Sequence, residues 1–213
     1  MLTIIDYGVG NLASIANMLA YLGVAHRIAN EPADILSAQR LVLPGIGAFD
    51  AAMDKLHGTG LLAALHQRVM ADKVPVLGIC LGMQLMCQSS QEGRHPGLAW
   101  FDAEVQRFDA ARMDKPGVIP HMGWNEVQTM QPQHPVLVGL PQSPRYYFVH
   151  SYHVVCHDPS DELLRCQYGY AFAAAIARDN LLAVQFHPEK SHRFGMALLA
   201  NFANWQPACS ARD

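Results

Sequence analysis

The sequence predicts an α/β protein with three layers, αβα, in which a mostly parallel central sheet gains antiparallel strands in the second half of the chain. In the first half, short apolar runs alternate four times with segments of helical spacing, which is typical of βα units with parallel strands. In the second half, strand-like runs follow one another across turns, which favours antiparallel additions. Hydrophobic residues make up 51% and charged residues 15% of the chain, as suits a sheet covered on both faces.

The composition limits the domain organisation and the class of partner. A chain of 213 residues is long enough for one full hydrophobic core, so we expect a single domain over residues 1–213. The formal net charge of -3 gives no electrostatic reason to expect nucleic acid or an anionic membrane as a partner. No apolar run approaches the length of a membrane span. The five cysteines are odd in number and lack a Cys-x-x-Cys pair, which indicates neither a disulfide framework nor a zinc ribbon and fits a reducing cytoplasm.

The first half of the chain contains four predicted βα units. Each predicted strand is a short apolar run, and each predicted helix repeats apolar residues every three or four positions. We expect strands at 2–5, 24–29, 40–43 and 74–79, and helices at 12–22, 32–38, 51–56 and 61–70, with a further helix after residue 80. Since a sheet of this kind binds ligands at the carboxyl ends of its strands, the residues that follow the strands are candidates for a functional site.

The turn after the first strand permits a second interpretation. Gly8-x-Gly10-x-x-Ala13 formally matches the dinucleotide-binding fingerprint, with a strand before it and a helix after it. Glu31 lies near the distance expected for a ribose-binding carboxylate, but Pro32 follows it and no second nucleotide-binding half is visible. A tight βα turn is therefore the favoured interpretation, and a nucleotide-binding α/β module is the alternative.

The second half reads as a series of strands closed by one helix. We expect strands at 98–108, 118–119, 124–129, 146–155, 162–168, 172–178 and 181–186, and a helix at 192–205. Asp179-Asn180 has the composition of a hairpin turn. His150 and His153 have metal-ligand spacing, but on one continuous strand they would point to opposite faces, so no metal site is predicted.

Cys80 lies at the turn between the fourth strand and the helix that follows it. The pattern Gly78-x-Cys80-x-Gly82 has the form of a nucleophile elbow, with sulfur in place of the usual hydroxyl oxygen. Glycine is needed on both sides because a sharp strand-to-helix turn brings these positions close together. The helix N-terminus favours a thiolate, and the free amide of Leu81 can donate to a developing oxyanion. The alternative is an inert buried cysteine between two packing glycines.

Two other strand ends carry residues that would complete such a site. His187 and Glu189 are two positions apart on a strand end that Pro188 would hold extended, so the carboxylate can accept the Nδ1 proton and leave Nε2 free for a thiol proton. Gly45 and Gly47 follow the third strand, where they allow the backbone to aim a second oxyanion amide, although an ordinary Gly-Pro turn is equally compatible. A cysteine, a base and an orienting carboxylate together predict acyl transfer through a thioester.

The chain resembles the class I (triad) glutamine amidotransferases over nearly its whole length, through the motifs Gly78-Ile-Cys-Leu-Gly-Met-Gln84 and Gln185-Phe-His-Pro-Glu189. The resemblance implies hydrolysis of L-glutamine to glutamate and ammonia without a cofactor, by a catalytic triad of Cys80, His187 and Glu189. It implies an oxyanion hole made by the amides of Leu81 and of the loop at Gly45, Ile46 and Gly47. It also implies that the substrate is held by Gln84, Glu92, Ser151 and Tyr152, with Glu92 facing the ammonium group of glutamine.

Other segments resemble one branch of that family, the glutaminase subunits of imidazole glycerol phosphate synthases. They are Asp6-Tyr-Gly-Val-Gly-Asn11, Pro44-Gly-Ile-Gly47, Pro120-His-Met-Gly-Trp-Asn125 and Tyr147-Phe-Val-His-Ser-Tyr152. This branch passes ammonia to a (β/α)8-barrel cyclase, which forms imidazole glycerol phosphate and aminoimidazole carboxamide ribotide in histidine biosynthesis. The resemblance implies a heterodimer whose interface includes Asn11, Met122, Trp124 and Asn125.

The same resemblance implies regulation by the partner. Glutaminase activity would stay low until the cyclase binds its own substrate, and a peptide flip in the loop at 45–47 is the expected switch. Three alternatives remain open at this stage. Trp124 is equally compatible with a core aromatic, the chain is also compatible with the glutaminase subunit of another amidotransferase, and the triad could be vestigial in a partner-binding module.

Overall fold

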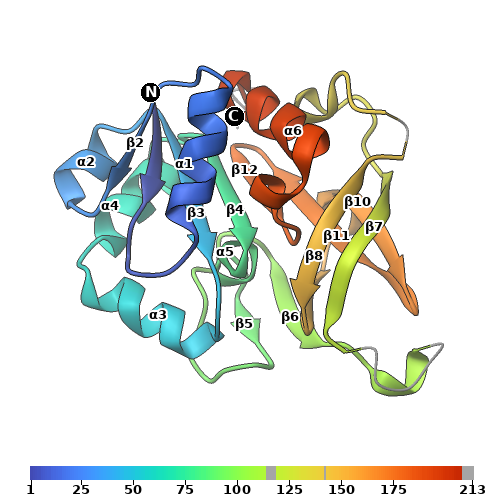
Figure 1. Cartoon of the computed structure of the whole chain (residues 1–213). Coiled ribbons are helices and arrows are strands. Elements are labelled where there is room, and N and C mark those ends of the chain that lie inside the picture. The colour runs from blue at the N-terminus through green and yellow to red at the C-terminus, as the bar shows by residue number, and fades with distance from the viewer. Residues whose placement is uncertain (114–118, 142, 208–213) are drawn as a thin grey trace, which may run out of the picture.

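The computed structural model describes residues 1–113, 119–141 and 143–207, and shows three layers with a central sheet (Figure 1). Within these residues, 12 strands are joined by backbone pairing, and nine of them form the path β2-β1-β3-β4-β12-β11-β10-β7-β8. The strands are β1 (Leu2–Ile5), β2 (His26–Ala29), β3 (Arg40–Gly45), β4 (Val76–Cys80), β5 (Ser89–Ser90), β6 (Ala103–Arg107), β7 (His121–Thr129), β8 (Arg145–His150), β9 (Tyr152–Cys156), β10 (Glu162–Tyr168), β11 (Tyr170–Arg178) and β12 (Leu181–Val184). The helices are α1 (Leu12–Tyr21), α2 (Pro32–Leu36), α3 (Phe49–Gly58), α4 (Leu62–His66), α5 (Leu81–Leu85) and α6 (His192–Asn204).

The parallel part of the sheet brings three strand ends together. Strand β4 lies between β3 and β12, and both neighbours run parallel to it. The register sets Gly45 opposite Cys80 on one side, and Val184 opposite Ile79 on the other. Consequently the segment that begins after Val184 and the loop after Gly45 both leave the sheet beside Cys80. The expectation that parallel strands would gather the candidate residues at one edge of the sheet is confirmed.

The rest of the sheet is antiparallel. Strand β12 pairs antiparallel with β11, and the hairpin between them turns at Asp179, whose φ is 52°. From β11 the pairing continues antiparallel through β10, β7 and β8, while β9 and β6 branch from β11 on a second path. The predicted fold class, a three-layer αβα arrangement with antiparallel additions in the second half, is therefore correct.

Two hydrophobic cores lie on the two faces of the parallel strands. On one face, α1 and α6 pack side chains such as Leu19 and Phe202 against Ile4 and Leu77 (Figure 1). On the other face, α2, α3, α4 and α5 pack against the same strands. Because both faces are covered, the strands are mostly apolar, and every residue of β1, β4 and β12 is buried.

Most predicted strands differ from the observed ones by a few residues at their ends, and two differ more deeply. The run at 98–108 forms a strand only from Ala103, because its first part packs over the end of α5 instead: the amides of Leu98 and Trp100 donate to the carbonyl oxygens of Leu85 and Met86, at 2.7 and 2.9 Å. The run at 146–155 breaks at Ser151 into β8 and β9. The predicted strand at 118–119 begins outside the described residues, since residue 118 is not among them.

The break at Ser151 also changes the arrangement of two histidines. The rings of His150 and His153 both lie against Phe108, with ring centroids 5.2 and 4.8 Å from it. The expectation that they would point to opposite faces is therefore wrong, because it assumed one continuous strand. Among the residues described here, no group of three or more His, Cys, Asp or Glu side chains is arranged to hold a metal ion. No helix in this part of the chain is long and apolar enough to cross a membrane.

Candidate active site

Cys80 has a strained backbone at the end of β4. Its φ is 54° and its ψ is -110°, a conformation that a residue with a side chain rarely adopts. This is the geometry of a sharp strand-to-helix turn, and α5 begins at the next residue. A strained, partly inaccessible cysteine at this turn indicates that the fold holds the sulfur in a set position for function.

Glycines allow the turn to form, for the steric reason that the sequence suggests. A Cβ added to Gly82 would lie 1.9 Å from the carbonyl oxygen of Leu43, on the neighbouring strand. A Cβ added to Gly78 would lie 2.5 Å from the sulfur of Met86 and 3.0 Å from the carbonyl oxygen of Gly82. No side chain fits at either position, since real Cβ atoms do not approach other atoms so closely. The inert-cysteine alternative explains the glycines equally well, so the surroundings of the sulfur must decide.

His187 and Glu189 form a buried pair beside that sulfur. The Nδ1 atom of His187 is 2.7 Å from Oε1 of Glu189, and the two side chains are 3% and 2% exposed. The backbone between them is not extended as expected: Pro188 begins a short 3-10 turn, Pro188–Lys190. The contact between His187 and Glu189 was predicted correctly, but the prediction assumed an extended backbone and the structure has a turn. The amide of His187 donates to the carbonyl oxygen of Tyr147 at 2.9 Å, which fixes the turn against β8.

The electrostatics of His187 are set by its two neighbours. Burial lowers its pKa, but the Cys80 sulfur and the Glu189 carboxylate outweigh burial and raise the pKa of His187 to about 9. Its Nε2 atom has no partner with hydrogen-bond geometry among the described residues. The sulfur is nevertheless close enough to favour the charged imidazole, so Nε2 is the ring nitrogen available for proton transfer with the thiol.

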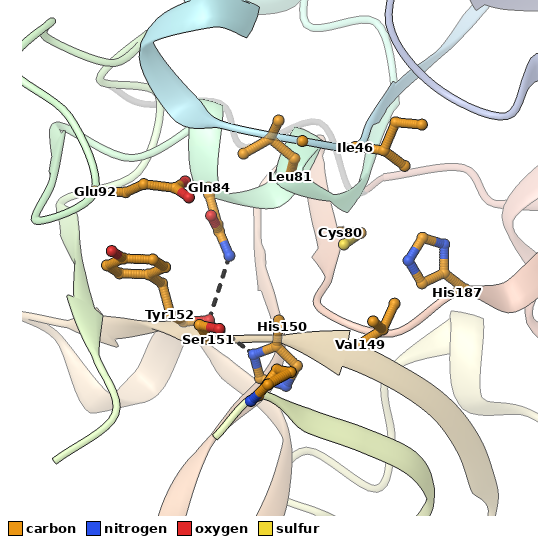
Figure 2. Close-up of a pocket in the computed structure, with 12 residues that line it drawn as sticks. Ile46, Cys80, Leu81, Gln84, Glu92, Val149, His150, Ser151, Tyr152 and His187 are labelled. Carbon is orange, nitrogen blue, oxygen red and sulfur yellow. Dashed lines mark hydrogen bonds between the residues drawn. The ribbon is translucent and has the colours of Figure 1, made fainter. Parts of the chain in front are cut away.

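A cavity of about 390 Å³ opens beside the sulfur. Figure 2 shows its lining, with Cys80 and His187 at one end and Glu92 at the other. Most of the predicted site residues line it: Ile46, Gly47, Cys80, Leu81, Gln84, Glu92, Ser151, Tyr152 and His187. Glu189 lies behind His187 and Gly45 lies within β3, so neither is part of the lining. The inert-cysteine alternative is disfavoured, because a structural cysteine would not share a cavity with an ion-paired histidine.

Glu92 is held by the segment that follows β3. Its Oε2 atom accepts a hydrogen bond from the amide of Phe49 at 3.1 Å. Burial raises the pKa of Glu92, and nearby Asp50 raises it further, against the opposite effect of the Phe49 amide. Asp50 in turn accepts hydrogen bonds from the amides of Arg94 and His95, at 2.9 and 3.0 Å, and so anchors the loop that carries Glu92.

The loop at 45–47 borders the cavity through Ile46 and Gly47, and a glycine stands at each of its ends. Gly47 has a φ of 88°, which favours glycine, and the side chain of Ile46 between the glycines is 47% exposed. The strand before the loop is fixed, since the hydroxyl of Tyr7 donates to the carbonyl oxygen of Pro44 at 2.7 Å. The turn with the dinucleotide-like glycines thus packs against this loop, and Tyr7 was not identified from the sequence.

Four further residues were missed although they belong to the site. Pro120, Val149 and His150 line the cavity, and Gln185 lies directly behind the sulfur. The Nε2 atom of Gln185 donates to the Sγ atom of Cys80 at 3.9 Å. The predicted strand 181–186 includes Gln185, but its contact with the sulfur depends on the pairing of β12 with β4, which a local pattern does not contain.

The residues expected at a partner interface lie outside the cavity. Met122 and Trp124 on β7 are 62% and 40% exposed, which argues against a core role for Trp124. The Trp124 ring stacks on His192, with centroids 5.3 Å apart and ring planes 3° apart. The side chain of Asn11 accepts a hydrogen bond from the amide of Ser14, and that of Asn125 donates to the carbonyl oxygen of Gln167, at 3.4 and 3.0 Å.

Comparison with known proteins agrees with this geometry. The family model described as glutamine amidotransferase class-I matches residues 3–205. The chain belongs to the class I glutamine amidotransferase family. Solved structures share the fold: the crystal structure of a glutamine amidotransferase has a TM-score of 0.73 at 16% identity, covering 95% of this chain and 99% of that one. The PurLQS structure from Thermotoga maritima has a TM-score of 0.70 at 13% identity, covering 95% and 97%.

Curated amidotransferase relatives are similar over almost their entire length. Imidazole glycerol phosphate synthase subunit HisH 2 of Pseudomonas aeruginosa is 50% identical over 202 residues, covering 95% of this chain and 98% of that protein. The subunit HisH 2 of Methanococcus maripaludis is 46% identical over 202 residues, covering 95% and 98%. The subunit HisH of Leptospira interrogans is 42% identical over 204 residues, covering 96% and 100%.

Proposed function

We propose that this chain is the glutaminase subunit of an imidazole glycerol phosphate synthase. It hydrolyses L-glutamine through a thioester on Cys80 and passes the ammonia to a (β/α)8-barrel cyclase subunit. The observation that carries the proposal is the Cys80 sulfur facing the same cavity as His187, which is paired with Glu189 at 2.7 Å. The choice of synthase is supported by 50% identity over 95% of the chain to a subunit of that name.

The first half of the reaction forms the thioester. The sulfur of Cys80 attacks the side-chain carbonyl carbon of glutamine, and its proton passes to Nε2 of His187. The resulting tetrahedral oxyanion accepts hydrogen bonds from the amide of Leu81 and from the loop at 45–47. When the carbon–nitrogen bond breaks, Nε2 returns the proton to the leaving nitrogen, so ammonia departs and a glutamyl thioester remains.

The second half releases glutamate. A water molecule takes the place of the ammonia, and Nε2 of His187 accepts its proton as the oxygen attacks the thioester carbon. The carbon–sulfur bond breaks, and the proton goes back to the sulfur. Glu189 keeps the imidazole in one orientation throughout, because Nδ1 stays hydrogen-bonded to the carboxylate.

The opposite end of the cavity suits the charged groups of the substrate. Glu92 lies there with its carboxylate half-buried, and an ammonium group beside it would favour the ionised carboxylate. Gln84, Ser151 and Tyr152 would hold the rest of the amino-acid moiety. No cofactor enters the reaction, since each step is a proton transfer or an acyl transfer.

The partner and the location of the protein belong to the same proposal. The cyclase subunit would cover Met122 and Trp124, which are the exposed apolar residues of β7, together with Asn11 and Asn125. The loop at 45–47 would be the switch, since glycines flank Ile46 and the peptide between them can rotate at small cost. The heterodimer would work in the cytoplasm, where a free catalytic thiol stays reduced.

Labelling of Cys80 tests the glutaminase directly. An electrophilic glutamine analogue, 6-diazo-5-oxonorleucine, should modify the peptide that contains Cys80 in the wild type and leave the Cys80→Ser variant unmodified. Cys156→Ser is the matched control, because Cys156 is more exposed than the buried Cys80 but lies outside the cavity. Labelling that survives in Cys80→Ser and is lost in Cys156→Ser would refute the proposal.

A kinetic comparison tests the partner. Glutamine hydrolysis by the chain alone is compared with hydrolysis in the presence of the cyclase subunit and a ligand of the cyclase site. We expect a large increase with both added. Equal rates under the three conditions would remove the switch at the 45–47 loop while leaving the glutaminase chemistry intact.

A further inference from the structure

Gln185 is a buried polar residue whose side-chain amide lies beside the sulfur of Cys80. It is 0% exposed, and its amide donates to the carbonyl oxygen of Ala174 on β11 at 2.9 Å, which fixes its backbone. Its Nε2 atom lies 3.9 Å from the Sγ atom of Cys80, and its Oε1 atom accepts from Nε2 of Gln84 at 3.1 Å. A buried amide next to the reacting sulfur, with both ends hydrogen-bonded, suggests a role in catalysis.

The direction of the Gln185 amide follows from a backbone carbonyl. The nitrogen and oxygen ends of a glutamine side chain have nearly the same shape, so their assignment must come from the hydrogen-bond network. Gln84 contacts the carbonyl oxygen of Tyr152 at 3.3 Å, and a carbonyl oxygen can only accept. Gln84 must therefore present its NH₂ group to Tyr152.

The second hydrogen of that NH₂ group points to Gln185. Since Gln84 donates this hydrogen bond, the oxygen of Gln185 must accept it, and the NH₂ group of Gln185 then faces Cys80. The same Tyr152 carbonyl oxygen is also 2.7 Å from Nδ1 of His150, so both of its lone pairs are used and the network is anchored in β9. Turning the Gln185 amide over would set two NH₂ groups against each other and leave an oxygen against the sulfur.

We propose that Gln185 is a positioning residue, whose fixed N–H group holds the sulfur of Cys80 and favours its thiolate over its thiol. A donor bonds a charged acceptor more strongly than a neutral one, so a buried N–H aimed at sulfur stabilises the negative form. Without the sulfur this N–H would be unpaired in a water-free interior, which is costly. His187 and Gln185 would then have different roles at the sulfur. His187 accepts and returns protons, whereas Gln185 donates a hydrogen bond and transfers no proton.

The inference rests on the proposed role of Cys80 as the nucleophile. Its test measures the sulfur without glutamine, by following alkylation of Cys80 with iodoacetamide as a function of pH and quantifying the Cys80 peptide by mass spectrometry. Gln185→Met keeps the size of the side chain but has no donor. We expect the midpoint of its pH profile to rise and the alkylation rate at neutral pH to fall about tenfold, since one pH unit changes the thiolate fraction tenfold.

A second variant separates the donor from the shape of the side chain. Gln185→Glu still accepts from Gln84 but turns an oxygen toward the sulfur, so its midpoint should rise further than that of Gln185→Met. Gln88→Met is the matched control, because Gln88 is exposed and its side chain donates to Oδ1 of Asp102 at 2.9 Å, away from the sulfur. Its profile should equal that of the wild type.

An unchanged midpoint in a folded Gln185→Met variant would overturn the inference. If that variant does not fold, Gln185→Glu decides alone, and an unchanged midpoint there has the same consequence. Failure of the proposed function looks different: wild-type Cys80 would then resist the electrophilic glutamine analogue, whatever the behaviour of the Gln185 variants.

Discussion

The Nδ1 atom of His187 lies 2.7 Å from Oε1 of Glu189, although a proline that begins a helical turn separates the two residues. The contact means that Glu189 fixes the ring by accepting its Nδ1 proton, and that Nε2 points to the cavity with no other partner among the described residues. Glu189 is not itself among the residues that line the cavity. Its contribution is therefore expected to pass entirely through the imidazole.

Glu189→Gln separates orientation from charge. The amide oxygen can still accept from Nδ1, so the ring should keep its orientation, while the lost charge removes one of the causes that raise the pKa of His187 to about 9. We expect glutaminase turnover in the complex to fall about ten- to a hundredfold, less than for loss of the histidine itself. The measurement is the pH–rate profile of glutamine hydrolysis. A loss equal to that of His187→Ala would contradict a purely orienting role.

Cys80→Ala should abolish glutamine use. The nucleophile is gone, but the cyclase partner still accepts ammonia from solution, so synthesis with added ammonium salt should continue at the wild-type rate. His187→Ala should reduce glutamine-dependent turnover about a thousandfold or more, and the remaining activity would come from the oxyanion donors. Both outcomes are read from product formation with glutamine and with ammonium salt. Loss of the ammonium-driven reaction would show that the substitution damages the complex rather than the chemistry.

Gly82→Ala should prevent the elbow from forming. Its Cβ would lie 1.9 Å from the carbonyl oxygen of Leu43, so the strand and the helix would have to move apart. We expect a loss of more than about 3 kcal/mol in the free energy of unfolding, the upper end for overpacking. Gly58→Ala is the control: nothing lies within 4 Å of its Cβ, and it should be neutral or slightly stabilising. Urea unfolding compares the two, and equal effects would refute the steric argument.

A buried pair of histidines should make the protein sensitive to acid. Burial lowers the pKa of His150 to about 3 and that of His121 to about 4. Nδ1 of His121 lies 3.0 Å from Nε2 of His150. Both stay neutral in the folded protein but take up a proton when it unfolds. Their stabilising effect is therefore complete above the ordinary pKa of 6.5 and is lost as the pH falls toward these lowered values.

The free energy of unfolding is expected to fall by about 2 kcal/mol for each histidine as the pH falls from 6.5 to 5. His150→Asn should flatten the dependence of the unfolding free energy on pH, because it removes one of the two groups. His57→Asn serves as the control, since His57 is exposed on α3. If His150→Asn and the wild type lose stability equally between pH 7 and pH 5, the neutral buried pair is not the cause.

Trp124→Ala should weaken binding of the cyclase subunit. The ring is 40% exposed and is held in place by stacking on His192, so it is a preformed aromatic anchor. We expect a loss of about 2 kcal/mol or more, which is roughly thirtyfold in Kd. Tyr21→Ala is the control, as Tyr21 is 80% exposed on α1. Equal Kd values for the two variants in titration calorimetry would show that Trp124 does not lie in the interface with the cyclase subunit.

The parallel half of the fold and the residues of the proposed triad could be picked out from local patterns. Buried parallel strands are mostly apolar, so β1, β3 and β4 were visible as runs, and the elbow glycines marked Cys80. The pairing of His187 with Glu189 was also predicted, although the extended spacer was wrong, since a proline is as compatible with the first position of a helical turn as with a strand.

The remaining features depend on contacts that a local pattern does not contain. The run at 98–101 is apolar because it packs over the end of α5, and apolar character alone does not distinguish that from a strand. The break at Ser151 put His150 beside His121 rather than on the opposite face of a strand from His153. Gln185 gained its place behind the sulfur only through the pairing of β12 with β4.

The most direct test of the account is to trap the glutamyl group during turnover. The complex is mixed with radiolabelled glutamine, quenched in acid and digested, and the label is located by peptide. We predict label on the peptide containing Cys80 in the wild type and none in Cys80→Ala. Continued glutamine hydrolysis by Cys80→Ala, or wild-type turnover with no label on Cys80, would contradict a glutamyl thioester formed on this sulfur with His187 as the proton carrier.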